Sequence, residues 1–314
     1  MATATPIQSS PPQTGPRTHL NPETTHSPLV LWHLLSLDAP TIAALWTWFI
    51  ARVNYIHLPT SSILAMAVAV WMLYAADRLM DARLMDIHLV QLQVNPAEDL
   101  EARHYFHHNH RTAFLTGILL SSLALAALLP RLEAAALHLY LILGGFLTGY
   151  FILIHATPSA VGSQKVAHRL PKEIAVGIFF SSAIFIPTVA RSPDLRLILL
   201  PSALLFAALC SLNCLFIYAW EHPRPNHGRP AHAATRLALR HLPLLTLSIL
   251  AVATILCLTK IHQAPWPIPA ACALSAILLL LLHHARRNIA PITLRAAADL
   301  ALTTPLLLLP FLHL

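Results

Sequence analysis

A series of long apolar runs constrains the fold of this chain more than any other feature of its sequence. A helix needs about 20 mostly apolar residues to cross the roughly 30 Å hydrocarbon core of a bilayer. Nine segments of about that length recur along the 314 residues, at 29–53, 58–76, 112–130, 133–155, 172–190, 196–219, 240–259, 264–284 and 293–313. The sequence therefore predicts an all-α polytopic membrane protein with nine transmembrane helices.

The composition agrees with a membrane protein. Hydrophobic residues make up 56% of the chain and charged residues only 11%, whereas a soluble domain carries about 25% charged residues. Few glycines and the lack of a ten-residue alternating pattern favour helices over a barrel. The formal charge of +7 comes without an aromatic–basic motif, so nucleic acid is not predicted as a partner.

The distribution of the 20 Lys and Arg residues tests the division into nine segments. When the gaps are assigned alternately to two sides, fifteen of these residues fall on the side of the N-terminus and five on the other. Basic residues are enriched in cytoplasmic loops. The sequence therefore predicts a multi-pass protein of the inner (cytoplasmic) membrane, with its N-terminus in the cytoplasm and its C-terminus outside. The longer gaps on the cytoplasmic side place the expected function there.

The chain is expected to consist of a disordered cytoplasmic tail, 1–28, and one transmembrane domain, 29–314. The tail is rich in Pro, Ser and Thr and lacks the basic start and apolar core of a signal peptide. Asp38 and the proline two residues later interrupt the first apolar segment, and this pattern is typical of a helix start. Two interpretations stay open: residues 30–37 lie along the interface before a span at 39–53, or one long span begins near residue 29.

Two carboxylates stand four residues apart at the end of the second apolar segment. On a helix Asp77 and Asp81 share one face, and such a pair suits Mg²⁺, which takes one or two carboxylates together with phosphate oxygens. Asp86 extends the acidic set. The alternative is that the carboxylates only pair with Arg78 and Arg83 at a wet helix end.

Further polar residues mark the sixth and ninth segments. Asn213 is an amide inside an apolar run, and such residues usually face the bundle interior or bond a neighbouring helix. Glu221 shares its helical face and is a candidate metal ligand, with His222 a candidate ligand or base. Arg295 and Asp299 stand four residues apart, and on a helix we expect these two charges to neutralise each other.

A basic stretch precedes the fifth apolar segment. It contains Lys165, Arg169 and Lys172, and the helix is expected to begin at Lys172 and Glu173. A helix start beside three cations is a good site for an anion such as a diphosphate. The alternative is that these cations only set the topology.

Topology and motif placement together resemble the UbiA superfamily of intramembrane prenyltransferases, with this chain a degenerate member. Those proteins have nine helices and two aspartate-rich motifs on the cytoplasmic side, after helices two and six. The first family motif, NDxxDxxxD, is similar to 73–81, where Asp77 and Asp81 match and Leu-Tyr replaces Asn-Asp. The second, YAxxDxxxD, is similar to 218–226, where Tyr-Ala is kept and His and Asn replace the aspartates. The basic stretch before Gly177 is similar to the family's Lys/Arg segment before helix five.

The resemblance implies a Mg²⁺-dependent transferase of the lipid bilayer. It would move an isoprenoid from an allylic polyprenyl diphosphate to an aromatic or other lipophilic acceptor, with the prenyl tail in an apolar tunnel. The implied catalytic residues are Asp77, Asp81, Asn213 and Glu221; the implied metal ligands are Asp77, Asp81 and Glu221; the implied diphosphate-binding residues are Lys172, Arg169, Lys165 and Arg78.

Two other functions stay open at this stage. The altered motifs suit a non-catalytic UbiA-like protein that binds an isoprenoid or a quinone, and binding that is independent of magnesium would favour it. A nine-helix transporter would use Asp38, Asn213 and Asp299 as a polar path, and broken helices at those sites would favour it. The sequence has no nucleotide-binding glycine loop, which leaves ATP-driven transport without support.

Overall fold

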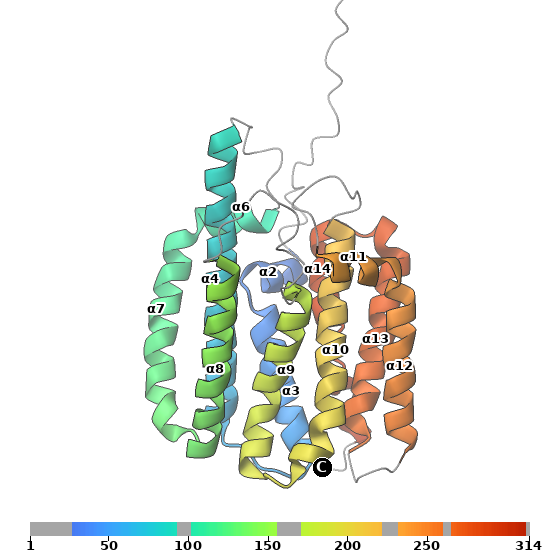
Figure 1. The fold of residues 1–314 in the computed structure, drawn as a ribbon. Helices are drawn as coiled ribbons and strands as arrows, with labels where there is room; N and C mark the ends of the chain where they lie inside the picture. The colour runs from blue at the N-terminus through green and yellow to red at the C-terminus, as the bar shows by residue number, and fades with distance from the viewer. Residues whose placement is uncertain (1–26, 93–101, 156–170, 222–231, 260–264, 312–314) are drawn as a thin grey trace, which may run out of the picture.

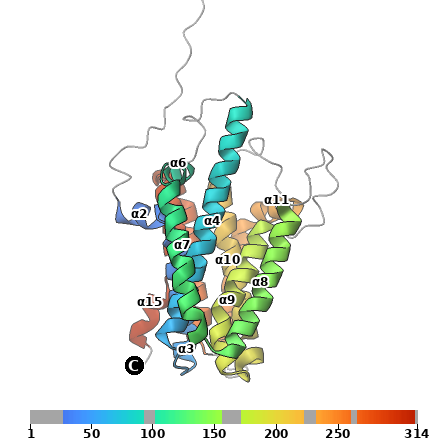
Figure 2. The same ribbon diagram turned by 90° about the vertical axis from the view of Figure 1, so that its left-hand side faces the viewer.

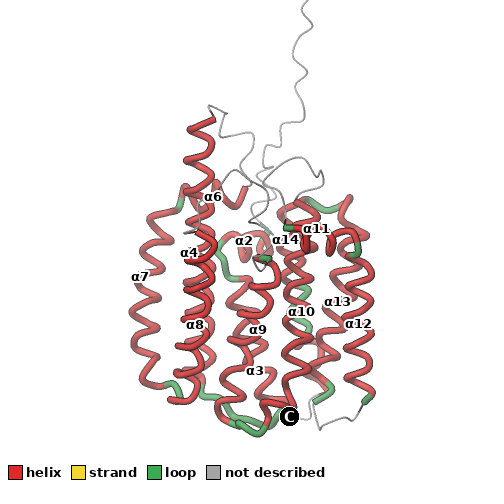
Figure 3. Tube along the Cα trace, in the orientation of Figure 1, coloured by secondary structure: helices red, strands yellow, loops and turns green. Residues whose placement is uncertain are grey.

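The computed structural model describes residues 27–92, 102–155, 171–221, 232–259 and 265–311. All regular secondary structure in these ranges is helical, which confirms the predicted all-α class. The long helices run side by side as a bundle (Figure 1), and short turns join them at one end (Figure 3). Residues 1–26 of the expected tail, together with Lys165, Arg169 and His222, lie outside the described ranges.

The helices follow the predicted apolar segments closely. Their bounds are α2 Pro28–Leu34, α3 Asp38–Val53, α4 Thr60–Leu92, α6 Ala102–Asn109, α7 Arg111–Leu128, α8 Ala134–His155, α9 Lys172–Arg191, α10 Leu195–Glu221, α11 Ala233–Arg240, α12 Leu242–Leu258, α13 Pro267–Ala285, α14 Pro291–Leu300 and α15 Pro305–Leu308. Short 3₁₀ turns, η1 Leu129–Arg131, η4 Arg286–Asn288 and η5 Leu309–Phe311, follow α7, α13 and α15.

Several of these helices are long and apolar enough to cross a membrane. Five do so as single straight segments, in α4, α7, α9, α10 and α13, and the number rises to eight if each bent pair counts as one span. The bent pairs are α2 with α3, α11 with α12, and α14 with α15. The apolar stretch of α8, Ala134–Tyr150, is shorter. The described part of the chain thus has the character of a membrane protein.

The break predicted in the first apolar segment is present. Helices α2 and α3 meet at an angle of 92°, so α2 lies across one end of the bundle while α3 runs through its centre (Figures 1 and 2). The sequence suggests Asp38 as the helix cap, whereas α3 begins at Asp38 itself with Leu37 at the N-cap position. The end of the bundle that carries α2 is called the α2 end below.

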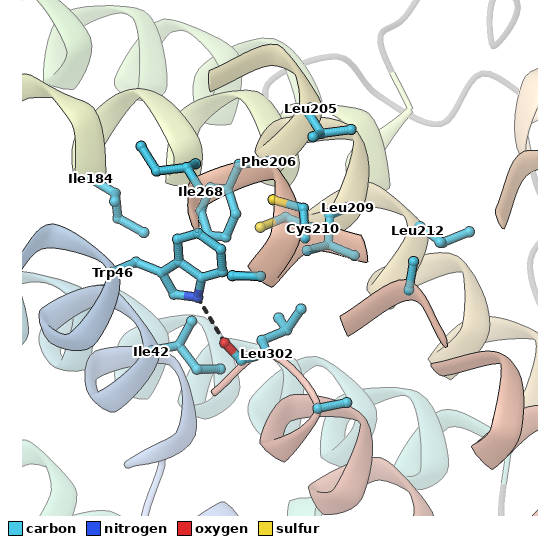
Figure 4. Packing of buried hydrophobic residues seen from close by; sticks show 14 of the residues in the cluster. Ile42, Trp46, Ile184, Leu205, Phe206, Leu209, Cys210, Leu212, Ile268 and Leu302 are labelled. Carbon is cyan, nitrogen blue, oxygen red and sulfur yellow. Dashed lines mark hydrogen bonds between the residues drawn. The ribbon is translucent and has the colours of Figure 1, made fainter. Parts of the chain in front are cut away.

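The core of the bundle forms where α3, α9, α10 and α13 meet. Trp46 of α3 is fully buried, and its ring lies 4.2 Å, centroid to centroid, from that of Phe206 on α10. Figure 4 shows its indole N–H donating to the Leu302 carbonyl at 2.7 Å, next to Ile184 of α9. Because a buried indole N–H needs an acceptor, this bond ties the central helix to the turn after α14.

Close packing of α9 on α10 depends on a glycine. A Cβ atom added at Gly177 would collide with the Ser211 hydroxyl and with the Ala207 carbonyl of α10. Small residues let membrane helices approach closely, since van der Waals packing replaces the hydrophobic drive that water would supply. The position of α9, and with it of Lys172 at its first turn, therefore follows from Gly177.

The outer helices α7 and α8 carry their large apolar side chains on the outside. Leu119 and Leu123 of α7 are each 62% exposed, and Leu141 and Phe146 of α8 are 65% and 68% exposed. Such surfaces are typical of a protein whose solvent is lipid, because a soluble monomer rarely exposes contiguous patches of this kind.

Candidate functional site

The residues that the sequence singles out lie near the α2 end of the bundle. Four elements converge there: the middle of α4, the first turn of α9, the last turns of α10, and α14. The helix α4 continues past the other helices at this end (Figure 2). Its predicted span ended at residue 76, and it extends to Leu92 because the sequence from Asp77 onward holds good helix formers and no Gly or Pro.

Two of the motifs that the sequence singles out approach each other at this end of the bundle. The Lys172 ammonium lies 3.5 Å from an Asp77 carboxylate oxygen, across 95 positions of sequence. Both side chains are accessible, with exposed fractions of 58% and 29%. Asp81 follows one turn later on α4 and is partly buried. A cation from α9 and two carboxylates from α4 therefore share the accessible end of the bundle.

The neighbouring residue, Arg78, points elsewhere. Its guanidinium is 4% exposed and donates to the His33 carbonyl at 2.7 Å, to an Asp38 carboxylate oxygen at 3.1 Å and to the Tyr74 hydroxyl at 2.6 Å. It also stacks over the Tyr74 ring at 4.1 Å. The family resemblance implies that Arg78 binds diphosphate. In the structure its guanidinium instead donates to three acceptors within the bundle, on α2, α3 and α4.

A buried ionic network surrounds Arg78, and sequence reasoning did not foresee it. His33 Nδ1 lies 2.6 Å from one carboxylate oxygen of Asp38 and 3.6 Å from one of Asp299. The other Asp38 oxygen accepts from the Ala39 amide at 3.0 Å. His33 and Asp38 are fully buried, and Asp299 is 8% exposed. The sequence feature that points to this network is His33, a histidine in an apolar run five residues before Asp38.

The two polar residues of α10 both face α14. Asn213 donates its amide to an Asp299 oxygen at 3.0 Å, and Glu221 forms an ion pair with Arg295. The two residues stand about two helical turns apart on α10, and their contacts with the same helix agree with the expectation that they share a face. Asp299 and Arg295 thus have partners on α10, in addition to standing one turn apart on α14.

These contacts belong to one polar layer rather than to separate sites. Tyr74 belongs to the buried network, because its hydroxyl accepts from Arg78, which also donates to Asp38. On α14, Asp299 lies next to His33 of α2 and accepts from Asn213 of α10. The accessible Asp77–Lys172 pair borders this network, because Asp77 directly precedes Arg78 on α4.

The polar layer offers two sets of carboxylates for a cation. His33, Asp38 and Asp299 bring ligand atoms within 4.8 Å of one another, yet the 2.6 Å contact fits a hydrogen bond and Arg78 already supplies positive charge to Asp38. Asp77 and Asp81 instead stand at the accessible end, where hard oxygen ligands suit Mg²⁺ and leave room for phosphate oxygens and water.

Comparison with known proteins adds no relative. No protein-family model, curated protein or solved structure matches the chain.

Proposed function

We propose that this chain is an intramembrane prenyltransferase of UbiA type. It would use magnesium and transfer an isoprenoid from an allylic polyprenyl diphosphate to a lipophilic acceptor. The supporting observation is the approach of Lys172 to Asp77: the cation expected to bind diphosphate and the carboxylate expected to bind metal meet at one accessible end of the bundle.

The roles of the residues follow from their exposure. Asp77 and Asp81 would hold the magnesium ion, which when bound stabilises negative charge on a departing diphosphate. Lys172 would contact the diphosphate oxygens, since its ammonium is compact, mobile and more than half exposed. In the absence of substrate the same ammonium neutralises Asp77, so binding exchanges one ionic partner for another.

The buried network would position this site without touching the substrate. Arg78 follows Asp77 directly and is held by α2 and α3, so it fixes the rotation of α4 about its axis. Asn213 and Glu221 would act through α14 by fixing α10 against it. A metal-ligand role for Glu221 would require its release from Arg295.

The proposal includes the finer topology. Counting α8 with the straight helices and the bent pairs gives nine spans, as the family resemblance implies. Lys172 at the start of α9 and the arginines of α11 and η4 lie near the α2 end, and the positive-inside rule then places that end in the cytoplasm. The proposed site would face the cytoplasm, where soluble diphosphate can leave.

A second candidate has an observation of its own. Asp38 and Asp299 flank His33, and Asn213 bonds Asp299, so the three residues proposed for a transport path lie in one buried network. One oxygen of Asp299 and the amide oxygen of Asn213 have no hydrogen-bond partner there. A transporter would move a cation or polar solute through these groups.

The test is diphosphate release in nanodiscs. The full chain is offered geranyl, farnesyl and geranylgeranyl diphosphates, with host lipids as the acceptor source and with or without magnesium. We expect magnesium-dependent release that falls by about 100-fold in Asp77→Asn and Lys172→Gln, since each removes stabilisation of the leaving group. The matched control is Asp194→Asn, an exposed carboxylate just before α10.

Release that is unchanged in Asp77→Asn would contradict the proposal. Binding of diphosphates without magnesium and without release would favour the non-catalytic carrier. Uptake of solute into liposomes that requires Asp299, together with the lack of release, would favour the transporter.

A further inference from the structure

A second basic site lies on the other side of α10. A cavity of about 350 Å³ opens between the end of α10, the turn η4 and the start of α14. Its polar lining consists of Arg286, Arg287, Arg295, Glu221 and the indole of Trp220, and the rest is apolar. None of the functional roles proposed above uses Arg286 or Arg287.

The charges of this cavity leave a net attraction for anions. Glu221 and Arg295 neutralise each other as an ion pair. Arg286 and Arg287 are both exposed, and Arg286 donates to the backbone carbonyl of His283. Within the described ranges no carboxylate pairs with either of them. Two adjacent guanidinium groups are well matched to a phosphate, since each offers N–H donors in a fixed fork.

The surroundings of the cavity are those of a membrane interface. Leu281 is 59% exposed and lies five residues before Arg286 on α13, which corresponds to a rise of about 7 Å. The arginines therefore come directly after a stretch of α13 that carries an exposed leucine. Trp220 donates its N–H to His283 at 3.1 Å, and Trp is enriched at the level of lipid headgroups.

We infer that this cavity binds the phosphate headgroup of an anionic membrane lipid. Arg286 and Arg287 contact the phosphate, the Trp220 ring and the apolar lining contact the glycerol and first acyl carbons, and the acyl chains run along α13. A basic pocket between membrane helices at the cytoplasmic face is a physically suitable site for such a headgroup. This inference does not rest on the proposed transferase activity.

The experiment counts bound lipids by native mass spectrometry of the full chain in a neutral detergent. Phosphatidylglycerol and phosphatidylcholine of equal chain length are titrated in parallel. We expect phosphatidylglycerol to bind about tenfold more tightly, and Arg286→Gln/Arg287→Gln to remove that preference, because two charge-assisted contacts are lost. Arg240→Gln, an exposed arginine on α11 at the same end of the bundle, serves as the matched control and should bind like the parent.

Two further arms define the outcome. Arg286→Lys/Arg287→Lys keeps the charge and should retain part of the preference, which provides a folded variant if the glutamine pair unfolds. Asp77→Asn should bind phosphatidylglycerol like the parent, so a failed transferase leaves this result intact. Equal affinity for the two lipids, an unchanged preference in the glutamine variant, or displacement by millimolar inorganic phosphate would overturn the inference.

Discussion

Asp77 and Arg78 are neighbours in the sequence, yet they belong to regions with opposite character. Asp77 meets Lys172 at an accessible end of the bundle, with both side chains partly in solvent. Arg78 lies one helical step away, about 100° around α4, and is buried against Asp38, His33 and Tyr74. An accessible ion pair is worth little stability and can be exchanged for a ligand, whereas a buried charge is costly to leave alone.

The difference separates a group that can react from the group that holds it in place. The buried network fixes α2, α3 and α4 relative to one another, and two more bonds support the α2–α3 turn. Trp71 donates to the Leu35 carbonyl at 3.1 Å, and Ser36 lies 3.1 Å from His107 of α6. Within the described ranges, the accessible Asp77–Lys172 pair has no such support, and it can therefore change partner.

The largest effect is expected from removing the buried cation. Arg78→Met leaves Asp38 without its guanidinium partner, and the free energy of unfolding should fall by about 3–5 kcal/mol. Thermal unfolding in detergent measures the loss. The exposed Arg83 of the same helix is the control, and Arg83→Met should unfold like the parent. Equal melting of both variants would show that the network does not stabilise the bundle.

A second variant of the same pair sharpens the interpretation. Arg78→Met combined with Asp38→Asn removes both charges, so the double variant should be more stable than Arg78→Met alone. The recovered stability measures the coupling between the two side chains. A double variant as unstable as the sum of the single ones would assign the loss to packing instead of charge.

An intermediate effect is expected where α9 meets α10. Gly177→Ala forces a methyl group against Ser211 and the Ala207 carbonyl, and overpacking of this kind costs about 1–3 kcal/mol. Because α9 carries Lys172, the variant should also weaken diphosphate binding. Gly144→Ala in α8 has open space around the added methyl and should leave melting and binding unchanged.

A smaller effect is expected for the bond between α10 and α14. Asn213→Ala removes the donor to Asp299, and leaving a buried acceptor unsatisfied costs about 1–3 kcal/mol in proteins generally, with values in membranes near the lower limit. Thermal unfolding is again the measurement. Ser211→Ala, the control, removes a hydroxyl that donates to the Ala207 carbonyl of the same helix. A loss of stability as large as that of Asn213→Ala would show that the Asn213–Asp299 bond has no special role.

The smallest effect on stability is expected for the accessible pair. Asp77→Asn and Lys172→Gln should each change the free energy of unfolding by less than about 1 kcal/mol, while both lower the proposed activity by about 100-fold. Melting curves recorded beside the activity assay check this. A large loss of stability in Asp77→Asn would place that residue with the structural network and remove the contrast with Arg78.

The fold was largely predictable because apolar length and charge asymmetry are strong signals. The span expected at 196–219 corresponds to α10, Leu195–Glu221, and the interruption at Asp38 corresponds to a bend of 92°. The bend of 42° between α14 and α15 was not predicted. Each half of that pair is short and apolar, so the composition alone does not distinguish a bent span from a straight one.

The site was predictable only in part. Asp77 and Lys172 stood out because charges at the ends of apolar runs are easy to find. His33 did not, because a single histidine in an apolar run is ordinary until Asp38 and Asp299 are seen beside it. The orientation of Arg78 could not be predicted from the sequence either, because the partners that bury it lie beside the α2–α3 turn, about 40 positions away.

The most direct test of the central claim compares the two neighbours in one assay. Magnesium-dependent diphosphate release and the melting temperature are measured for the parent, for Asp77→Asn, and for Arg78→Lys, which keeps the charge. The account predicts that Asp77→Asn melts like the parent but releases diphosphate about 100-fold more slowly. It predicts that Arg78→Lys melts lower, while the molecules that remain folded still release diphosphate. Parental release by Asp77→Asn would contradict the account.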